Sequence, residues 1–289
     1  MRIHLDTDLG GDTDDACALA MLLGRPDAEV VGVTTVHDPV GRRAGYAHHL
    51  LSMAGRHDIP VAVGTAPSLT TGTFPGDLPD EGRYWGARIP PRPAGDAVDL
   101  LRASAEGGAT IVAIGPFTNL ALAGAAMANA PVVLMGGWNG YPDAGLPQWG
   151  PEMDWNVTSD PEAANAVARV AGDLTLATLA VTMNAQLRRP DLTRLRAAGA
   201  VGSLLAAQAV EHTRDHAQPG DLLNYQYDSA ACATALGWPE ITVEESSLAS
   251  ITDMQGDRPI RSVCDIDTNA FTDTWLAAIE RLSSERVEP

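Results

Sequence analysis

Five aspartates lie close together near the start of the chain, in the segment Asp6-Thr7-Asp8-Leu9-Gly10-Gly11-Asp12-Thr13-Asp14-Asp15. Turn formation and helix capping explain one or two of them, such as Asp12 or Asp14, but the mutual repulsion of five makes the cluster costly. A bound hard cation would offset that cost. Ca²⁺ accepts six to eight oxygen ligands in flexible geometry, whereas Mg²⁺ requires an octahedron. The segment therefore indicates a metal site rather than a merely acidic turn.

The elements around this cluster must place it at the edge of a sheet. Short β-branched runs alternate with helical patterns, which predicts an α/β fold with a mainly parallel sheet flanked by helices. Open sheets of this kind bind ligands at the carboxyl ends of their strands, where the aspartates lie. The predicted strands cover residues 2–5, 29–36, 110–114, 132–135, 174–179, 241–244 and 261–266. The predicted helices cover residues 15–23, 42–54, 119–128, 162–170, 204–214, 229–236 and 269–282.

Two stretches interrupt the alternation. Residues 65–95 are rich in Gly and Pro, and residues 136–155 carry Trp138, Trp149 and Trp155. Loops longer than about 12–15 residues in a compact domain are usually functional or disordered. We expect both stretches to be insertions over one rim of the sheet in a single domain.

Composition excludes several function classes. Of 289 residues, 45% are hydrophobic, which is enough for a sizeable core, and 37 acidic against 19 basic residues leave a formal charge of −18. That charge repels nucleic-acid backbones and anionic membranes, so neither is expected as a partner. All the basic residues are Arg, and the absence of Lys excludes a Walker-A phosphate loop and Schiff-base chemistry.

The cysteines and the N-terminal segment indicate the cellular compartment. Cys17, Cys232 and Cys264 lie far apart without a CxxC pair, which predicts buried thiols in a reducing environment. The first residues lack the pattern of a signal peptide, and no apolar run is long enough for a membrane helix. We expect a cytoplasmic protein.

The chain contains, in order, DTDLGGDTDDACALAML, GVTTV, GPFTNLA, MGG, DWN with DPEAA, and Asp228 at the head of an Ala-rich helix. With these motifs it resembles the nucleoside hydrolase family, calcium-dependent enzymes that cleave the N-glycosidic bond of ribonucleosides. These blocks occur in the order of the family and span nearly the whole chain. The resemblance implies one Rossmann-like domain over residues 1–289, a small-molecule nucleoside as partner, and a homodimer or homotetramer.

The resemblance also implies a role for each matching residue. Asp8, Asp15 and Asp228 would supply carboxylates to Ca²⁺ and Thr118 its carbonyl oxygen, and Asp8 would be the general base that deprotonates water. The sugar would be bound by Asp14 and Asn156 at the 2′- and 3′-hydroxyls, by Asp154 toward the 5′-hydroxyl, and by Asp38 and Asp228. Trp155 either stacks on the base or packs the insertion against the sheet.

The chain departs from the family pattern beside Asp228, where many members have a His that donates a proton to a purine. Here the residue is Tyr227, which is the candidate to assist departure of the base. A phenol is a weaker acid than imidazolium near neutral pH, so Tyr227 disfavours the purine-selective acid catalysis that this His provides. Asp154 stands where the family has a longer Glu, which also indicates an unusual substrate.

Three alternatives stay open. His212 and His216, four residues apart on a predicted helix, either bind zinc or lie at the rim of the site, solvated or donating to the nucleobase. Asp6-Thr7-Asp8 also mimics the DxD motif of haloacid dehalogenase-type phosphatases. The chain could also be a non-catalytic nucleoside or sugar binder that keeps the metal cage.

Overall fold

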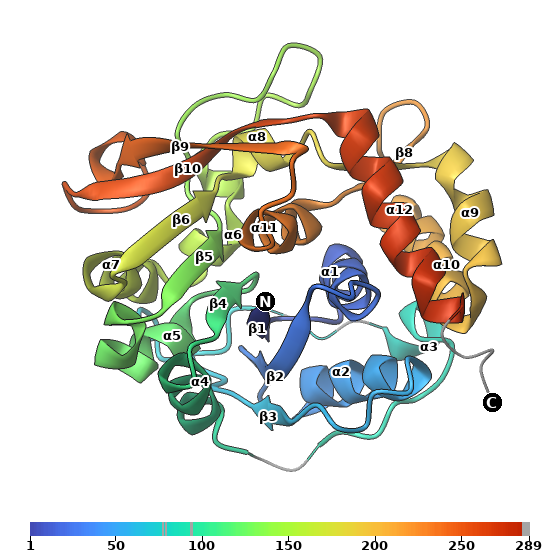
Figure 1. Ribbon diagram of the computed structural model, residues 1–289, viewed down its shortest axis with the longest axis horizontal. Coiled ribbons are helices and arrows are strands. Elements are labelled where there is room, and N and C mark those ends of the chain that lie inside the picture. The colour runs from blue at the N-terminus through green and yellow to red at the C-terminus, as the bar shows by residue number, and fades with distance from the viewer. Residues whose placement is uncertain (77, 79, 93–94, 285–289) are drawn as a thin grey trace.

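An eight-stranded sheet, in the order β3-β2-β1-β4-β5-β6-β10-β9, runs through the middle of the computed structural model (Figure 1). The structure describes residues 1–76, 78, 80–92 and 95–284. Residues 77, 79, 93 and 94, which belong to the predicted insertion 65–95, and residues 285–289 lie outside the described residues. In chain order the strands of this sheet are β1 (Arg2–Thr7), β2 (Glu29–Thr35), β3 (Val61–Val63), β4 (Thr110–Ala113), β5 (Pro131–Met135), β6 (Asp173–Ala177), β9 (Ile241–Ser247) and β10 (Pro259–Ile266).

The sheet is mixed, as expected. Neighbouring strands from β3 to β10 pair in parallel, and β9 pairs antiparallel with β10 at the edge. From β1 the chain builds outward in one direction to β2 and β3, and in the other direction to β4 and the remaining strands. The loops that follow β1 and β4 therefore diverge, and such a switch point is where open α/β sheets bind ligands. The fold predicts a site beside the first aspartates.

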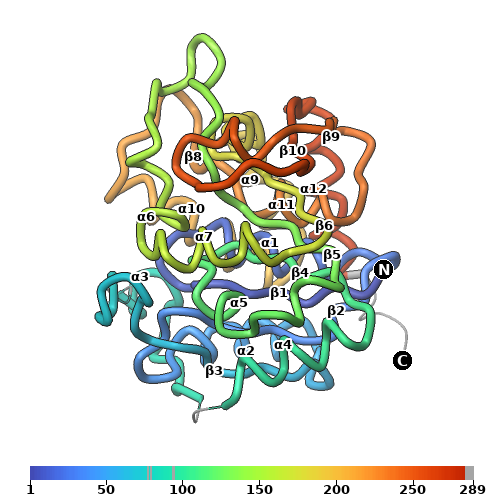
Figure 2. Tube along the Cα trace, turned by 90° about the vertical axis from the view of Figure 1, so that its left-hand side faces the viewer, coloured from blue at the N-terminus to red at the C-terminus, as the bar shows by residue number. Residues whose placement is uncertain are grey.

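Helices cover both faces of the sheet, so the protein has layers (Figures 1 and 2). On one face lie α1 (Asp14–Leu23) and α11 (Tyr227–Ala235), and α2 (Arg42–Met53) lies beside α1 over β2 and β3. Outside α1 and α11 pack α9 (Leu192–Ala197), α10 (Gly199–Asp215) and α12 (Thr268–Ser284). On the other face lie α4 (Ala97–Glu106), α5 (Thr118–Ala123) and α7 (Pro161–Val170). Short elements near the carboxyl ends of the strands include α3 (Glu81–Tyr84), α6 (Trp155–Thr158), α8 (Leu179–Thr182) and the antiparallel pair β7 (Gln186–Arg188) and β8 (Leu222–Tyr225).

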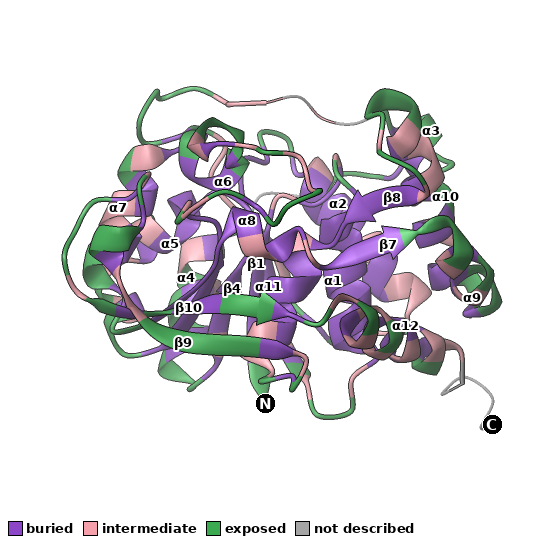
Figure 3. Ribbon diagram, turned by 90° about the horizontal axis from the view of Figure 1, so that it is seen from above, coloured by how far each residue is buried: buried purple, intermediate pink, exposed green. Residues whose placement is uncertain are grey.

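Helices α1 and α11 are the buried centre of this arrangement (Figure 3). Every residue of α1 is buried, because the helix lies between the sheet, α11 and α12. Both helices are rich in Ala, whose small side chain lets the two backbones approach closely and has the highest helix propensity. This close packing brings the N-termini of α1 and α11 together at the cavity described below.

Most of the expected elements are present with shifted ends. Residues 119–128 divide into α5 and a 3₁₀ turn (Gly124–Ala128), and the strand expected to reach residue 179 ends at Ala177. The elements that the sequence patterns did not predict are β3, α3, α4, α6, α8, α9, β7 and β8. Most of them are short, and three- or four-residue elements carry too little periodicity to be recognised.

The expectation of three buried thiols is wrong for one of them. Cys17 and Cys232 are buried, whereas Cys264 is exposed on β10. A register shift between Val263 and Asp265 interrupts the alternation of the strand, so Cys264 and Asp265 both lie on the exposed surface. In the part of the chain that the structure describes, no helix has both the length and the apolar character required to cross a membrane.

Candidate active site

A cavity of about 1160 Å³ opens at the carboxyl ends of the central strands. It is bounded by residues that follow β1, end β4 and β5, and begin α1 and α11. The acidic residues that line it are Asp8, Asp12, Asp14, Asp15, Glu152, Asp154, Asp215 and Asp228. Among the described lining residues, Arg43 is the only Arg. Such an excess of carboxylates favours ligands that are cations or that develop positive charge.

The N-terminal turns of α1 and α11 place three carboxylates at one point. Asp14 and Asp15 begin α1, Asp228 is the second residue of α11, and all three side chains are buried. One oxygen of each lies within 4.8 Å of one another. The partial positive charge of a helix N-terminus stabilises an acidic side chain, and here two such ends meet. Residues more than 200 positions apart thus form one oxygen-rich cluster.

Burial acts against ionisation of this cluster. It raises the pKa of Asp14, Asp15 and Asp228 well above the usual range, and the charges of the neighbouring aspartates raise each pKa further. Two groups lower the pKa of Asp15 in part. The Thr7 hydroxyl donates to its carboxylate, and the positive charge of Arg43 is nearby. Carboxylates held this close in a buried site are the donor set that a hard divalent cation satisfies. The residues present therefore fit such an ion.

Asp8 faces the same cavity from the loop after β1. Burial raises its pKa, which the charge of Arg43 and a hydrogen bond from Trp155 lower in part. The indole Nε1 of Trp155 donates to Asp8 Oδ2 at 3.2 Å. A Cβ on Gly115 would lie 2.9 Å from Asp8 Oδ1, so only Gly allows the β4 loop to approach this carboxylate.

Arg43, which the sequence analysis did not single out, joins the two loops beside Asp8. Its side chain is buried, with Nε donating to the carbonyl of His37 at 3.0 Å. Its Nη1 donates to the carbonyls of Asp8 and Leu9. The guanidinium therefore ties the loop after β1 to the loop after β2 and places positive charge against the carboxylates.

We expect Arg43→Gln to lower the free energy of unfolding by about 1.5–3 kcal/mol, because buried carbonyls lose a charged donor. The matched control is Arg42→Gln. Arg42 forms a half-buried ion pair with Glu81 at 3.2 Å, and its loss is expected to cost less than about 1 kcal/mol. Urea unfolding of the two variants measures the difference, and equal destabilisation would remove the proposed role of Arg43.

Asp154 and Asn156 line the cavity from the loop before α6 and from α6 itself, as expected for sugar ligands. Asn156 Nδ2 donates to the carbonyls of Ile114 and Met135 at 3.0 and 3.1 Å, which leaves its Oδ1 to accept from a ligand. Asp154 accepts from the backbone N–H groups of Gly137 and Val157, and burial raises its pKa to about 7. Gly137 reaches this carboxylate with φ +93°, a conformation that favours Gly.

Two predicted site residues do not line the cavity. Thr118 is the first residue of α5, and its hydroxyl donates to Asp160 at 2.7 Å. Asp38 Oδ2 accepts from Thr35 and from the backbone N–H of Ala44, so it holds the turn between β2 and α2. These contacts occupy the Thr118 hydroxyl and one oxygen of Asp38, whereas the ligand atom expected of Thr118 is its carbonyl oxygen, so both roles stay predictions. The residue at the end of β4 that does line the cavity is Ile114, whose carbonyl also binds Asn156.

Aromatic side chains and histidines form the other end of the cavity. Tyr225 and Tyr227 lie with ring centroids 5.4 Å apart, and Trp149 packs edge-on against Tyr225 at 5.9 Å. His212 of α10 and His216, the residue after that helix, also line the cavity, and His216 is the exposed one. They are not grouped with a third metal-binding side chain among the described residues, which disfavours zinc. This end offers flat surfaces for a planar ring.

Trp155 is 49% exposed, so it is not a core residue. Its ring lies next to the Gly/Pro-rich insertion, where a Cβ on Gly76 would come within 3.2 Å of it. By contrast, Trp275 on α12 is 1% exposed and belongs to the core. Trp155 thus covers the acidic end of the cavity beneath the insertion.

Several contributing residues were missed by the sequence analysis for different reasons. Ile114 acts through its backbone, and its place at the end of a predicted strand was the available signal. Arg43, Asn224 and Glu152 had no motif or spacing to distinguish them. Their positions depend on how loops from different strands meet.

The fold and the site together define an α/β protein with a carboxylate-lined cavity at a topological switch point of its sheet. The sequence profile of the family described as inosine-uridine preferring nucleoside hydrolase matches residues 3–273. The chain therefore belongs to this family.

Relatives in other organisms agree with this assignment. A pyrimidine-specific ribonucleoside hydrolase, RihA, of Shewanella baltica is 33% identical over 214 residues, which are 68% of this chain and 65% of that protein. The RihA protein of Salmonella schwarzengrund is 32% identical over 73% of this chain and 70% of its own length. The chain thus matches slightly less than two thirds of the Shewanella protein.

Solved structures share the fold. The plant nucleoside hydrolase PpNRh1 has a TM-score of 0.79 and 23% identity, covering 96% of this chain and 98% of its own. The purine-preferring ribonucleoside hydrolase of Gardnerella vaginalis has a TM-score of 0.76 and 22% identity, covering 99% and 100%. At these identities the likeness supports the architecture alone.

Proposed function

We propose that this protein hydrolyses the N-glycosidic bond of ribonucleosides to free base and ribose. The observation that carries the proposal is the convergence of Asp8, Asp14, Asp15 and Asp228 in one cavity of a chain that belongs to the nucleoside hydrolase family. Asp8 comes from the loop after β1 and Asp228 from α11, so only this fold brings them together.

The cation in this proposal is Ca²⁺. Asp8, Asp15 and Asp228 would hold it, with the carbonyl of Ile114 in place of Thr118 because Ile114 lines the cavity. Several carboxylates in a loop-built site suit the high coordination number and flexible geometry of Ca²⁺ better than the octahedron of Mg²⁺. When bound, the ion would neutralise the carboxylates and lower the pKa of a water molecule.

The residues of the chain would carry the remaining steps. Asp8 accepts the proton of the attacking water, because its carboxylate lines the cavity and its other contacts are with Trp155 and the backbone. Asp14, Asp228 and Asn156 bind the sugar hydroxyls and fix the anomeric carbon in front of that water. As the C1′–N bond breaks, positive charge develops on the sugar, and the surrounding carboxylates stabilise it.

The aromatic end of the cavity would receive the base. Trp149, Tyr225 and Tyr227 offer stacking surfaces for either a purine or a pyrimidine. RihA is named for pyrimidines and the Gardnerella enzyme for purines. In this proposal the aromatic end of the cavity selects the nucleobase, and the acidic cluster does not. A homodimer or homotetramer and a cytoplasmic location complete the proposal.

Tyr227 contributes a hydrogen bond to the base in this proposal, and we expect Tyr227→Phe to lower kcat/KM by about tenfold or less, because one neutral hydrogen bond is worth about 1 kcal/mol. The Tyr227 hydroxyl is buried without a hydrogen-bond partner among the described residues. Burial also raises its pKa well above the usual range, so the phenol keeps its proton near neutral pH. Steady-state kinetics on each active nucleoside measure the effect. A loss of a thousandfold would instead make Tyr227 a proton donor.

The two rival functions are less consistent with the site. A haloacid dehalogenase-type phosphatase would need Asp6 in the cavity as its nucleophile. Asp6 is fully buried, accepts from Thr34 and Asn119, and is not among the lining residues. A non-catalytic nucleoside binder would share the same cavity and is separated only by assay.

The test is a panel of ribonucleosides and sugar phosphates, assayed for free ribose and for phosphate before and after prolonged chelation. We expect ribose from at least one nucleoside, loss of activity on chelation and recovery with Ca²⁺. Release of phosphate alone would support the phosphatase. Micromolar binding of nucleosides in calorimetry with no ribose released would support the non-catalytic binder.

A further inference from the structure

Two histidines cover the base end of the cavity from the last turns of α10. His212 is 6% exposed, whereas His216, one turn later, is exposed at the rim. Their ring centroids lie 4.5 Å apart with 32° between the planes. Both rings line the cavity that also contains Asp8 and Asp228. One imidazole is thus inside the site, and a second connects it to solvent.

Asp12 lies beside the inner ring. The Nδ1 atom of His212 is buried without a hydrogen-bond partner in the described part of the chain, and Asp12 Oδ1 lies 3.5 Å from it. Asp12 is itself held, because its Oδ1 accepts from Asn224 Nδ2 at 2.7 Å and from the backbone N–H of Thr13 at 2.6 Å. A carboxylate that accepts from one nitrogen of a His sets its tautomer and leaves the other nitrogen for a ligand, and protonation of His212 would draw the 3.5 Å contact into such a hydrogen bond. Here the nitrogen left for a ligand is Nε2.

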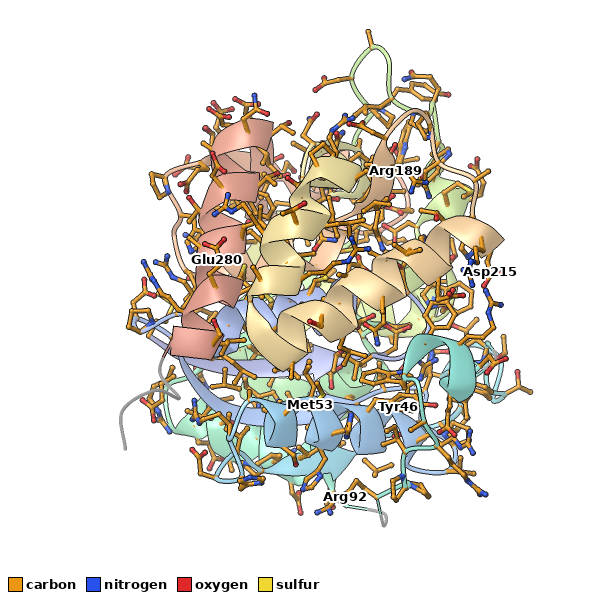
Figure 4. The ribbon with its side chains drawn as sticks, turned by 90° about the vertical axis from the view of Figure 1, so that its right-hand side faces the viewer. Tyr46, Met53, Arg92, Arg189, Asp215 and Glu280 are labelled. Carbon is orange, nitrogen blue, oxygen red and sulfur yellow. The ribbon has the colours of Figure 1, made fainter. Side chains whose placement is uncertain are left out.

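The charges around His212 come from three sides. Burial and His216 lower the pKa of His212, and Asp12 and Asp215 raise it. Asp215, at the C-terminal end of α10 beside α3 (Figure 4), is held by Arg83 and Tyr84 of α3 at 3.0 Å each. On β8, Tyr225 also lines the cavity, and Asp14 does so from the start of α1. The two carboxylates thus offset part of the cost of a buried imidazolium, which is a stronger acid than a solvated one.

We propose that His212 is the catalytic acid that protonates the departing nucleobase, that Asp12 is its positioning residue, and that His216 returns protons from solvent. This deepens the proposed ribonucleoside hydrolysis and rests on it. As the C1′–N bond breaks, its electron pair passes to the base, which takes the Nε2 proton of His212. The oxygen of water bonds to C1′, and the proton lost by that water passes to Asp8. One water is consumed, and the enzyme recovers both protonation states through solvent.

The structure favours His212 over Tyr227 for this step. The Tyr227 phenol keeps its proton for the reasons given above, and no carboxylate is hydrogen-bonded to its hydroxyl among the described side chains. His212 has a carboxylate oxygen 3.5 Å from its Nδ1 atom, a second imidazole tilted by 32° on its solvent side and a place in the lining. The proton donor would thus be His212 of α10, positioned by Asp12 of the loop before α1, and not Tyr227, which precedes Asp228.

The test compares natural nucleosides with 4-nitrophenyl β-D-ribofuranoside, whose leaving group departs as a stable anion and needs no acid. For His212→Gln we expect a loss in kcat/KM of about 10²–10⁴-fold on nucleosides and less than about fivefold on the nitrophenyl riboside. Asp12→Asn should show the same split with a smaller loss. His57→Gln, at an exposed position away from the cavity, is the matched control and should retain wild-type rates on both substrates.

Each other outcome overturns the assignment. Equal losses on both substrates, or a lower calcium content in His212→Gln, would make the residue structural. Unchanged nucleoside rates would exclude it as the acid. Wild-type protein that cleaves the nitrophenyl riboside and nucleosides, while His212→Gln behaves as wild type, would leave the proposed function intact and reject only this inference. Wild-type protein inactive on both substrates would reject the proposed function and this assignment with it.

Discussion

Asp8→Asn is expected to lower kcat/KM on any active ribonucleoside by at least about 10²–10⁴-fold, the range for loss of a general base. The substitution keeps the shape of the side chain but removes its ability to accept a proton. Asp8 lines the cavity, and its Oδ2 accepts only from the Trp155 indole among the described side chains. The fold should survive, because the contacts from Arg43 in this loop go to the carbonyls of Asp8 and Leu9 and not to the carboxylate.

Asp6→Asn is the matched control, two residues earlier and on β1 itself. Both hydrogen bonds to Asp6 fall on Oδ1, and Oδ2 is buried without a partner in the described structure. Burial raises the pKa of this carboxyl to about 7, so an uncharged amide is a mild replacement. Single-turnover release of ribose by the two variants, with circular dichroism to verify folding, measures the difference. An Asp8→Asn enzyme with more than a tenth of the wild-type rate would remove Asp8 from the role of base.

The second large effect expected is stabilisation by calcium that grows with pH. Ca²⁺ at a hundredfold excess over its Kd adds about 2.7 kcal/mol to the free energy of unfolding, or roughly 5–10 °C in Tm for a chain of this size. Ca²⁺ binds the ionised carboxylates and therefore competes with protons. The Tm increase should be small near pH 5 and largest near pH 8.

The sign follows from the direction of the pKa shifts. In the cation-free protein, burial raises the pKa of Asp14, Asp15 and Asp228, so the folded state holds protons that the unfolded chain releases above about pH 4. Stability of the cation-free protein should accordingly fall as pH rises through the folded pKa values, and Ca²⁺ should restore it. Chelated and calcium-loaded protein compared by calorimetry at several pH values measures both trends.

Asp228→Asn identifies the ligands in the same experiment. It removes one carboxylate from the cluster and should reduce both the calcium content and the calcium-dependent increase in Tm. Asp27→Asn, at an exposed position paired with Arg25, is the control and should keep both. A fully loaded Asp228→Asn protein with an unchanged Tm increase would exclude Asp228 as a ligand. A wild-type Tm that does not respond to Ca²⁺ would count against the proposed cofactor.

The sequence predicted the elements with strong local patterns. The apolar runs at β1, β2, β4 and β5 and the helix α1, which is apolar after its first two residues, could be predicted directly, because their patterns depend on neighbouring residues. The acidic opening segment indicated a cation site, and the structure places Asp14 and Asp15 in one cluster with Asp228. The family assignment from the motifs is confirmed by the match over residues 3–273.

The same reasoning was less informative where a polar side chain binds another part of the protein. Asp38 and Thr118 have the types expected of ligands, yet Asp38 holds the backbone of Ala44 and Thr118 binds Asp160. Residue type alone does not separate a carboxylate or hydroxyl that faces a ligand from one that satisfies buried backbone or side-chain groups. Only the direction of the side chain in the folded protein separates them.

What the sequence determined by itself is the α/β class, the order of the main elements and an excess of carboxylates after the first strand. The tertiary structure decided which of those carboxylates meet, that Arg43 joins two loops beside them, and that Asp12 lies against His212, 200 positions away. The physical reason is that secondary structure follows from the pattern of apolar and polar residues that are neighbours in the sequence. The site, in contrast, is built by the packing of α1, α10 and α11 at the carboxyl edge of one sheet.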